Sequence, residues 1–379
     1  MIKIARITTV PFAFVHIKDQ IRILKDQGYD ITLITCVKES TSFDLDDLGV
    51  KVLNVNFSRE INLWKDFRCL IELTWILLRN RFDIIHSSTP KAGLITALAG
   101  ILSFSKVRIH TFTGQRWQTL KGIKKKLLML FDRLIVLLNS KCFTDSPSQS
   151  EFLIKNKIGS REKVSCIGDG SFGGVDFGRF DLKRIGEKSI KIKEGLKISE
   201  EDFVFIYVGR VVKDKGINEL VESFLQLKEE AKNLKLVIVG PLEVDDPIEK
   251  ITLERINNCK DIVSVGYVSD PETYIYFADV FCIPSYREGF GTAVIEAAAL
   301  NVPSIGTDIP GLRDSIKDLE TGYLVGLKEI EGLTVTMKKC LREKIELKKM
   351  GERSRERAER LFSSKVVSEH LIEAYKHFF

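Results

Sequence analysis

Short apolar runs alternate along the chain with longer segments whose apolar residues recur at helical spacing. In the first half, the apolar runs predict strands at residues 3–9, 31–35, 50–55, 83–87, 106–112 and 142–144. Helices are expected at 16–27, 63–79 and 91–102, the second of them amphipathic, with a loop at 11–14. Strands and helices in alternation predict a parallel, doubly wound sheet that binds ligands at the carboxyl ends of its strands.

This pattern lapses near residues 171–181 and resumes after a lysine-rich stretch that runs to residue 197. Further strands are expected at 203–208, 234–239, 262–265, 280–283 and 304–306, with helices at 218–230 and 247–257. A chain of 379 residues is long enough for two domains with separate cores. We therefore place the domain boundary in the lapse, with one α/β domain at 1–185 and a second at 186–361.

The composition is that of an ordinary globular protein, with 44% hydrophobic and 29% charged residues. Seven cysteines without a C-x-x-C pair indicate reduced thiols in a cytoplasmic setting. The first residues read as a strand and not as a signal peptide, and the longest apolar runs are shorter than the ~20 residues that span a bilayer. We expect a cytoplasmic protein without a membrane span.

The glycines Gly168, Gly170 and Gly173 match the dinucleotide-binding pattern G-x-G-x-x-G. A strand is expected before them, at 164–167, but the following VDFGRF does not read as a helix. Because the pattern is meaningful only between a strand and a helix, we exclude a dinucleotide site here.

Residues 285–300, SYREGFGTAVIEAAAL, stand between an expected buried strand and an alanine-rich helix. Gly289 and Gly291 would let the backbone approach a ligand, and the first N–H groups of the helix would form an anion site. Glu288 is expected in the loop and Glu296 one turn inside the helix, where carboxylates suit sugar hydroxyls. The alternative is a simple corner with a solvated Glu288 and a capping Glu296.

Arg210 and Lys215 stand on a glycine-bounded loop between a strand and a helix. Such cations could neutralise a diphosphate, Arg210 as a planar fork and Lys215 as a point charge. They could also stabilise a leaving diphosphate without a metal. The Asp-x-Asp pair of Asp44 and Asp46 is expected to face solvent, and no histidine–cysteine cluster is visible, so we predict no metal and no other cofactor.

The order of GRVVKDKG and EGFGTAVIE resembles that of retaining glycosyltransferases of family 4, whose signature is E-x7-E. In addition, TPKAG at residues 89–93 is similar to bacterial members that assemble polysaccharides. This resemblance implies the GT-B fold, with two Rossmann-like domains facing a cleft. It places the acceptor side in 1–185 and the nucleotide-sugar site in 186–361, and it implies that 362–379 packs back on the first domain.

The resemblance also implies roles for individual residues. The expected catalytic residues are Glu288, Arg210, Lys215 and His110, of which His110 matches a cleft histidine, although such a residue is more often structural. The expected donor-binding residues are Gly209, Arg210, Lys215, Tyr267, Val268, Glu288, Gly289, Phe290, Gly291, Thr292 and Glu296. On the acceptor side they are Phe12, His86 and Lys91, but PFAF stands at 11–14 where the family has a glycine-rich loop.

In these roles, Arg210 and Lys215 hold the donor diphosphate. Glu288, with the backbone of residues 290 and 291, contacts the transferred sugar, and Glu296 contacts the ribose. Tyr267 and Val268 frame the nucleobase.

Residues 116–141 contain seven basic residues and a single acid, Asp132. Trp117 and a cluster of Lys121, Lys124, Lys125 and Lys126 precede the apolar stretch 127–138. Basic charge beside apolar surface favours contact with the anionic inner face of the cell membrane. The alternative is a core helix with a basic end.

We therefore expect a retaining glycosyltransferase that moves a sugar from a UDP-sugar to a lipid-linked or oligosaccharide acceptor in bacterial surface polysaccharide biosynthesis. One alternative is a GT-B sugar-nucleotide epimerase, which usually needs more cleft carboxylates and histidines than a chain with five histidines offers. Another is a nucleic-acid-binding module, but the basic residues lack interleaved aromatic platforms, so no nucleic-acid partner is expected.

Overall fold

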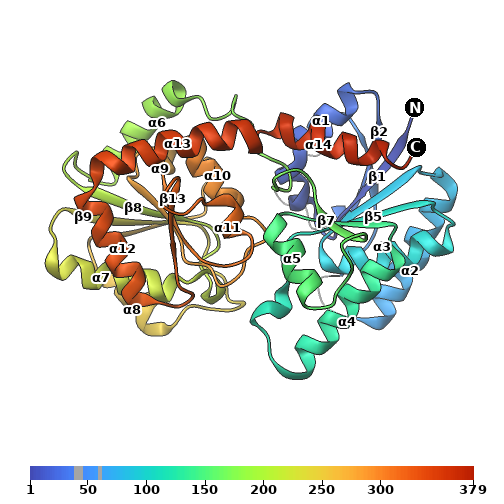
Figure 1. Cartoon of the computed structure of the whole chain (residues 1–379), viewed down its shortest axis with the longest axis horizontal. Coiled ribbons are helices and arrows are strands. Elements are labelled where there is room, and N and C mark those ends of the chain that lie inside the picture. Colours follow the sequence, from blue (N-terminus) through green and yellow to red (C-terminus); the bar gives the residue numbers. More distant parts are fainter. Residues whose placement is uncertain (38–45, 59–61) are drawn as a thin grey trace. The chain divides into compact units, whose positions relative to one another are not determined.

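The computed structural model describes residues 1–37, 46–58 and 62–379, which form two compact units. One unit contains Met1–Gly174 and Ser364–Phe379, and the other contains Val175–Ser363. Each unit is a parallel sheet with helices on both faces (Figure 1). The predicted α/β class with two Rossmann-like domains is confirmed.

The first unit contains a sheet in the order β3-β2-β1-β4-β5-β6-β7, in which all pairs are parallel. Its strands are β1 (Lys3–Ile7), β2 (Asp30–Thr35), β3 (Lys51–Asn54), β4 (Ile84–Ser88), β5 (Val107–Phe112), β6 (Lys141–Thr144) and β7 (Val164–Cys166). Its α-helices are α1 (Lys18–Asp26), α2 (Leu63–Asn80), α3 (Pro90–Leu102), α4 (Gly122–Leu138), α5 (Pro147–Lys155) and α14 (Ser364–Lys376).

Successive residues of β1 point to opposite faces of this sheet. Ile4 belongs to the core beneath α1 and α14, whereas Ala5 belongs to the core beneath α2 and α3. Both faces are therefore buried, as a parallel sheet requires, and this explains why its strands read as continuous apolar runs.

The second unit repeats this arrangement with the order β10-β9-β8-β11-β12-β13. Its strands are β8 (Phe203–Val208), β9 (Leu234–Val239), β10 (Ile262–Gly266), β11 (Val280–Ile283), β12 (Ser304–Thr307) and β13 (Gly322–Val325). Its α-helices are α6 (Leu182–Gly195), α7 (Ile217–Glu230), α8 (Lys250–Asn258), α9 (Glu272–Ile275), α10 (Thr292–Ala299), α11 (Leu312–Ser315), α12 (Ile330–Arg342) and α13 (Lys344–Phe362).

The structure corrects the sequence prediction at three places. The units divide at Gly174 and not at residue 185, because Val175, Phe180 and Ile185 are buried in the core of the second unit. Helix α6 occupies most of the lysine-rich stretch in which the sequence predicts a junction. The expected loop at 11–14 belongs to the 3-10 helix η1 (Pro11–Ile17), so α1 begins only at Lys18.

The glycines of G-x-G-x-x-G serve packing and not nucleotide binding. No helix follows them directly, since α6 begins only at Leu182. A Cβ at Gly168 would lie 2.0 Å from the His370 ring in α14, and one at Gly173 would lie 1.8 Å from the carbonyl oxygen of His16. The chain therefore needs glycine at both positions to pass α14 and η1.

Candidate active site

Two loops of the second unit leave the carboxyl ends of β8 and β11, which are neighbours in the sheet. The first loop, 209–216, contains the 3-10 helix η5 (Lys213–Lys215) and leads into α7. The second, 284–291, leads into α10. Because the strand order reverses between β8 and β11, this is where a doubly wound sheet binds ligands.

The two loops touch through their backbones. Gly216 has a φ of +72°, and a Cβ there would lie 2.0 Å from the carbonyl oxygen of Pro284. Only glycine allows this approach. The N–H of Tyr286 donates to the carbonyl oxygen of Asp214 at 2.8 Å, which joins the loops a second time.

Two ion pairs connect the same loops. Lys215 Nζ lies 2.6 Å from Glu288 Oε1, and Arg287 Nη2 lies 2.6 Å from Asp214 Oδ2. All four side chains are mostly shielded from solvent, which strengthens both attractions. The structure thus brings together Lys215 and Glu288, which the sequence placed in one site although they are far apart along the chain.

Arg210 lies in the first loop, but its guanidinium contacts Glu243, with 2.9 Å between Nη1 and Oε2. The hydroxyl of Tyr207 donates to the carbonyl oxygen of Arg210 at 2.7 Å. Burial raises the pKa of Tyr207 well above its usual value, the Glu288 carboxylate raises it further, and Arg210 lowers it. Tyr207 therefore lies close enough to both Glu288 and Arg210 for their charges to shift its pKa.

Gly209, which joins β8 to this loop, has a φ of +153°. A Cβ at this position would lie 2.7 Å from the Tyr207 hydroxyl. Glycine therefore leaves room for the hydrogen bond that fixes the start of the loop.

The start of α10 is shaped by the glycine pattern. Gly291 has a φ of +83° and precedes the first helical residue, Thr292, and this helix end has no side-chain cap. The first N–H groups of α10 are therefore suited to an anion. Phe290 is buried, and its ring packs edge-on against the ring of Phe362, with 4.9 Å between the centroids. This side chain anchors the loop that precedes α10. Gly289 is buried as well.

Glu296 follows Thr292 by about one helical turn. Burial raises the pKa of Glu296 to about 7, the nearby Arg179 lowers it, and Glu272 raises it. Arg179 itself binds Glu272 through two hydrogen bonds of 3.1 and 2.8 Å. The guanidinium of Arg179 is therefore already shared with Glu272 and only partly offsets the effect of burial on Glu296.

The residues expected to frame a nucleobase follow β10. Tyr267 is exposed, whereas Val268 packs against the apolar core of this unit. The Tyr267 ring is therefore open to solvent, whereas Val268 holds the segment against the core.

In the first unit, His110 lies near the end of β5 and is buried. Its Nδ1 is 2.9 Å from Ser87 Oγ, and its Nε2 has no hydrogen-bond partner among the described residues. Burial lowers the pKa of His110 to about 3, so the ring is neutral at pH 7. A Cβ at Gly93 of α3 would lie 2.5 Å from the ring, so the missing side chain of Gly93 makes room for it.

Two residues expected on the acceptor side are engaged within the protein. His86 is buried, with Nδ1 2.6 Å from the Tyr375 hydroxyl and Nε2 2.7 Å from Thr111 Oγ1. Both ring nitrogens are occupied, so His86 joins α14 to the sheet and does not present itself to an acceptor. The ammonium of Lys91 is 2.7 Å from Asp66 Oδ1 in α2. Phe12, in contrast, is exposed in η1.

The structure corrects the interpretation of residues 116–141. Trp117 is buried, its indole N–H donates to Asp132 Oδ2 at 2.7 Å, and its ring stacks on Phe152. It is therefore a core residue and not an interfacial anchor. The remaining α4 is divided, because Ile135 and Val136 are buried while other apolar residues and most lysines are exposed, namely Ile123, Leu127, Leu130, Leu137, Lys121, Lys124 and Lys126.

Sequence reasoning missed Asp214, Arg287 and Gly311. A Cβ at Gly311, where φ is +94°, would lie 2.7 Å from the carbonyl oxygen of Glu288, so a third loop supports the site from the carboxyl end of β12. A signal existed for the ion pairs, since KDK and YRE carry complementary charges in the two loops. A Pro-Gly pair also marked the turn at Gly311.

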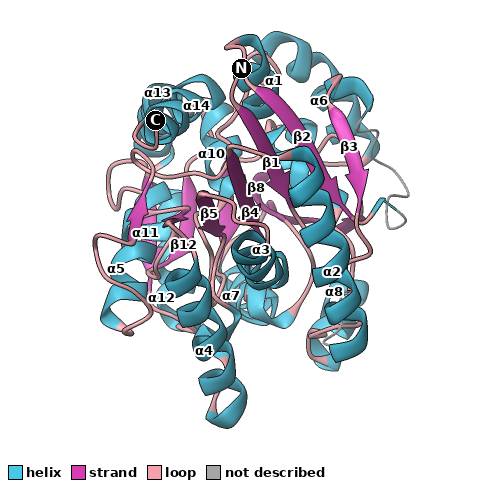
Figure 2. Ribbon diagram, turned by 90° about the vertical axis from the view of Figure 1, so that its right-hand side faces the viewer, coloured by secondary structure: helices cyan, strands magenta, loops and turns pink. Residues whose placement is uncertain are grey.

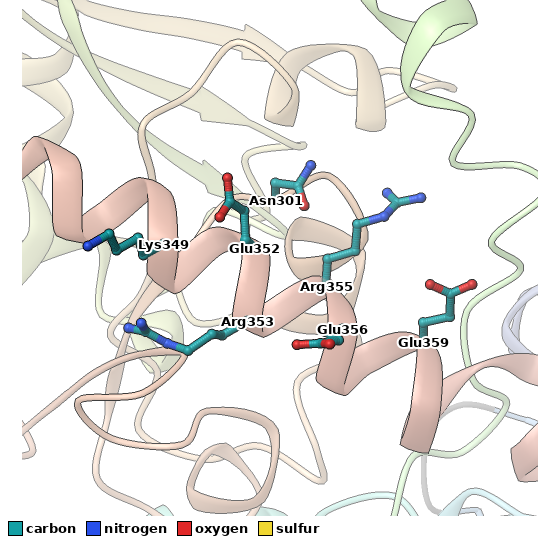
Figure 3. Close-up of a pocket in the computed structure, with 7 residues that line it drawn as sticks. All are labelled: Asn301, Lys349, Glu352, Arg353, Arg355, Glu356 and Glu359. Carbon is teal, nitrogen blue, oxygen red and sulfur yellow. The ribbon is translucent and has the colours of Figure 1, made fainter.

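Two further features lie apart from these loops. A hollow of about 530 Å³ follows α13 and is lined by Asn301, Lys349, Glu352, Arg353, Arg355, Glu356 and Glu359 (Figure 3). Its mixed charges are those of a solvated helix face, and Arg355 contacts the C-terminal end of α10, opposite the site. The Asp44-x-Asp46 pair lies outside the described side chains.

Among the described residues, no three histidine, cysteine or acidic side chains gather as a metal site. No described helix has the length and hydropathy to cross a membrane. All seven cysteines are free thiols.

Comparison with known proteins adds independent evidence. Residues 15–170 match the glycosyl transferase 4-like domain, and residues 188–357 match glycosyl transferases group 1. The capsular polysaccharide biosynthesis glycosyltransferase CapM of Staphylococcus aureus is 30% identical, over 99% of this chain and 97% of CapM. An Escherichia coli UDP-Gal:alpha-D-GlcNAc-diphosphoundecaprenol alpha-1,3-galactosyltransferase is 26% identical, over 86% of this chain and 84% of that protein.

Among solved structures, HepE of Anabaena in complex with UDP-glucose superposes with a TM-score of 0.80 at 14% identity, over 100% of both chains. At this low identity, the likeness to HepE shows only a shared fold. The full-length match to CapM and the two domain matches show the family of the chain. The chain therefore belongs to the glycosyltransferases that join a glycosyl transferase 4-like domain to a group 1 domain, and its fold is GT-B.

Proposed function

We propose that this glycosyltransferase moves a sugar from a UDP-sugar to a lipid-linked or oligosaccharide acceptor during assembly of a bacterial surface polysaccharide. The names of its relatives support this, since one acts in capsule biosynthesis and another uses UDP-Gal and a diphosphoundecaprenol-linked acceptor. The observation that carries the proposal is the contact between Lys215 and Glu288 at the carboxyl ends of β8 and β11.

In this proposal, Lys215 and Arg210 bind the donor diphosphate. Each is paired with a carboxylate of the same unit, Lys215 with Glu288 and Arg210 with Glu243. A diphosphate that draws Lys215 to itself would release Glu288 to accept hydrogen bonds from the sugar hydroxyls. The uncapped start of α10 adds N–H donors, Glu296 accepts from the ribose, and Tyr267 offers its ring to the nucleobase.

The chemical step we propose is a displacement on one face of the sugar. The bond between C1 and the diphosphate oxygen breaks, and the acceptor oxygen forms its bond to C1 from the same side, so that configuration is retained. The acceptor hydroxyl gives its proton to the departing phosphate oxygen. Lys215 and Arg210 stabilise the negative charge on the diphosphate, which is the role that a metal plays in other transferases.

His110 fits this scheme as a neutral hydrogen-bonding residue. With a pKa of about 3, it is a poor general acid at pH 7. Its unpartnered Nε2 is nevertheless a costly group to leave buried, and a ligand hydroxyl would satisfy it. On the acceptor side, we retain only Phe12, whose exposed ring can pack against a sugar.

We further propose that the chain associates peripherally with an anionic membrane through α4. Lys121 directly precedes this helix, and the exposed Lys124 and Lys126 lie in its first turns, followed by the exposed Leu127 and Leu130. Replacing these three lysines with serine should weaken binding to anionic vesicles. Serine at Lys183, Lys188 and Lys191, exposed on α6, removes equal charge and should not. Equal effects of the two variants would contradict a local role for α4.

The function is tested by incubation with radiolabelled UDP-sugars and a lipid extract from a polysaccharide-producing bacterium. Label that moves from one UDP-sugar to the lipid fraction supports the proposal. An epimerised nucleotide sugar without transfer would overturn it, as would the absence of transfer from every donor.

A further inference from the structure

Helix α2 is apolar on two opposite faces. One face, with Cys69, Leu73 and Leu77, is buried against the sheet. The other carries exposed apolar residues at helical spacing, namely Trp64, Phe67, Ile71, Trp75 and Leu78. Trp64 is 78% exposed and Trp75 is 59% exposed. An apolar helix face is normally buried against another element, whereas the outer face of α2 is exposed in the part of the chain that the structure describes.

The exposed charged residues of α2, which flank this outer apolar face, are all basic. Lys65, Arg68 and Arg79 are exposed, and the guanidinium of Arg79 lies 5.0 Å from the centre of the Trp75 ring. The two acids of α2 are turned inward, since Asp66 pairs with Lys91, and Glu72 accepts from the Asn56 N–H at 3.4 Å. A protein partner can have any charge, whereas exposed tryptophan beside arginine and lysine matches the boundary between lipid head groups and acyl chains.

Exposed apolar residues and exposed basic residues also occur on the neighbouring helices α3 and α4. Helices α2, α3 and α4 cover one face of the first sheet, with α3 in contact with both others (Figure 2). Leu98, Ile101 and Leu102 are exposed at the end of α3, Phe104 follows in the next turn, and α4 adds its own leucines and lysines. None of the acids of these three helices, all of which the structure describes, is exposed.

We propose that the outer face of α2, together with the end of α3, inserts into the interface of an anionic lipid bilayer and forms the apolar part of a docking surface whose charged part is α4. This inference extends the membrane association proposed above, but it does not depend on the donor chemistry. Trp64 and Trp75 lie at head-group level, and Phe67 and Ile71 reach the acyl boundary.

The surface predicts two components of binding with different salt dependence. The attraction of the α4 lysines fades as salt shortens the Debye length to about 3 Å at 1 M. Burial of the α2 side chains does not depend on salt in this way. The parent protein should therefore keep part of its vesicle binding at 1 M salt, and that remainder should belong to α2.

The chain offers a clean optical test because it contains only three tryptophans. Two are the exposed residues of α2, whereas Trp117 is 1% exposed. Full-length protein is mixed with anionic vesicles that carry brominated acyl chains, which quench tryptophan at the bilayer interface. We expect quenching in the parent protein. Vesicle binding by sedimentation without any quenching would overturn the proposal, and this measurement needs no variant.

The matched variant is Trp64→Gln with Trp75→Gln, which keeps the helix-forming character of α2. Its remaining emission should be insensitive to brominated lipid, and its vesicle partition at 1 M salt should fall about tenfold or more. Val335→Ser with Ile345→Ser removes exposed apolar residues elsewhere and should bind as the parent does. Unchanged partition of the tryptophan variant would contradict the proposal.

Two further readouts distinguish lipid docking from self-association and from a role in transfer. Light scattering that shows a dimeric parent and a monomeric tryptophan variant would overturn the proposal, because the face would then join two copies of the chain. Transfer to a soluble acceptor analogue should be equal in parent and variant. A selective loss of that transfer would also contradict docking, whereas a parent without transfer from any UDP-sugar contradicts only the proposed function.

Discussion

Lys215 and Glu288 form an ion pair between the loops after β8 and β11, and this pairing sets how the proposed site would respond to a ligand. A diphosphate carries more charge than one carboxylate, so it can compete for the ammonium of Lys215. The exchange would couple diphosphate binding to the release of Glu288 toward the sugar. Neither residue alone offers this coupling, because each would otherwise be a solvated charge on a loop.

Lys215→Met tests this coupling while keeping the apolar stem of the side chain. We expect kcat/KM to fall about a hundredfold or more, as for loss of one preorganised charge-stabilising group. Lys213→Met, in the same 3-10 turn, is the matched control, because Lys213 is half exposed and lies 4.0 Å from its nearest acid. Similar losses in both variants would show that only the net charge of the loop matters.

Glu296 should make donor binding depend on pH. Its pKa of about 7 reflects burial, and hydroxyl groups that donate to the carboxylate favour the ionised form. The affinity for a UDP-sugar should therefore weaken as pH falls below about 7, and Glu296→Gln should flatten this dependence. Calorimetric titration between pH 5.5 and 8.5 at constant ionic strength, about 0.15 M, provides the measurement. An equal slope in parent and variant would assign the titration to another group.

The same residue has an opposite effect on stability. Because the pKa of Glu296 in the folded protein is above that in the unfolded chain, ionisation costs folding free energy. This contribution is favourable below the unfolded value of about 4.5 and is lost as pH rises through about 7. Urea denaturation should therefore show the stability of Glu296→Gln rising relative to the parent over this range. A constant difference would contradict the raised pKa.

At the scale of elements, the site depends on the close approach of the loops after β8 and β11. Gly216→Ala would place a Cβ 2.0 Å from the carbonyl oxygen of Pro284, in a backbone conformation that disfavours side chains. We expect a loss of about 1–3 kcal/mol in unfolding free energy together with lower activity. Gly195→Ala is the control, since a Cβ there meets no atom within 4 Å. Equal unfolding free energies for the two variants would contradict the need for close approach between the two loops.

Element patterns explain what could be predicted from the sequence. The central strands are buried on both faces, so their apolar runs stood out, and the glycines beside Glu288 marked a strand–loop–helix corner. Helix α6 escaped because only Ile185, Gly186 and Ser189 are buried, which leaves a mostly charged segment that resembles a linker. The open face of α2 escaped for the opposite reason, since exposed and buried apolar residues have the same appearance in a sequence.

The site residues also differ in whether a local motif marks them or only contacts with distant segments position them. The proximity of Glu288 and Lys215 could be predicted because their two segments resemble, in order and spacing, the motifs of family 4 glycosyltransferases. The surroundings of two other residues could not be predicted, because the hydrogen bonds of His86 to Tyr375 and Thr111 join distant segments, and the buried Trp117 stacks on Phe152 in another helix. Such pairings follow from the topology and have no local signal.

At the scale of the whole molecule, the proposed chemistry places all charge compensation on groups of the protein itself. Activity should therefore survive excess EDTA, because Arg210 and Lys215 supply the positive charge that the diphosphate needs. Transfer is measured with and without chelator, with Lys215→Met assayed in parallel. Loss of activity that Mg²⁺ or Mn²⁺ restores would contradict this account.

The central claim is that the loops after β8 and β11 transfer a sugar from a UDP-sugar with retention of configuration. The most direct measurement is proton NMR of the product formed from an α-linked UDP-sugar and a defined diphospholipid-linked acceptor, by the parent and by Lys215→Met. The account predicts an α-linked product from the parent and almost none from the variant. A β-linked product, or equal amounts from both proteins, would contradict it.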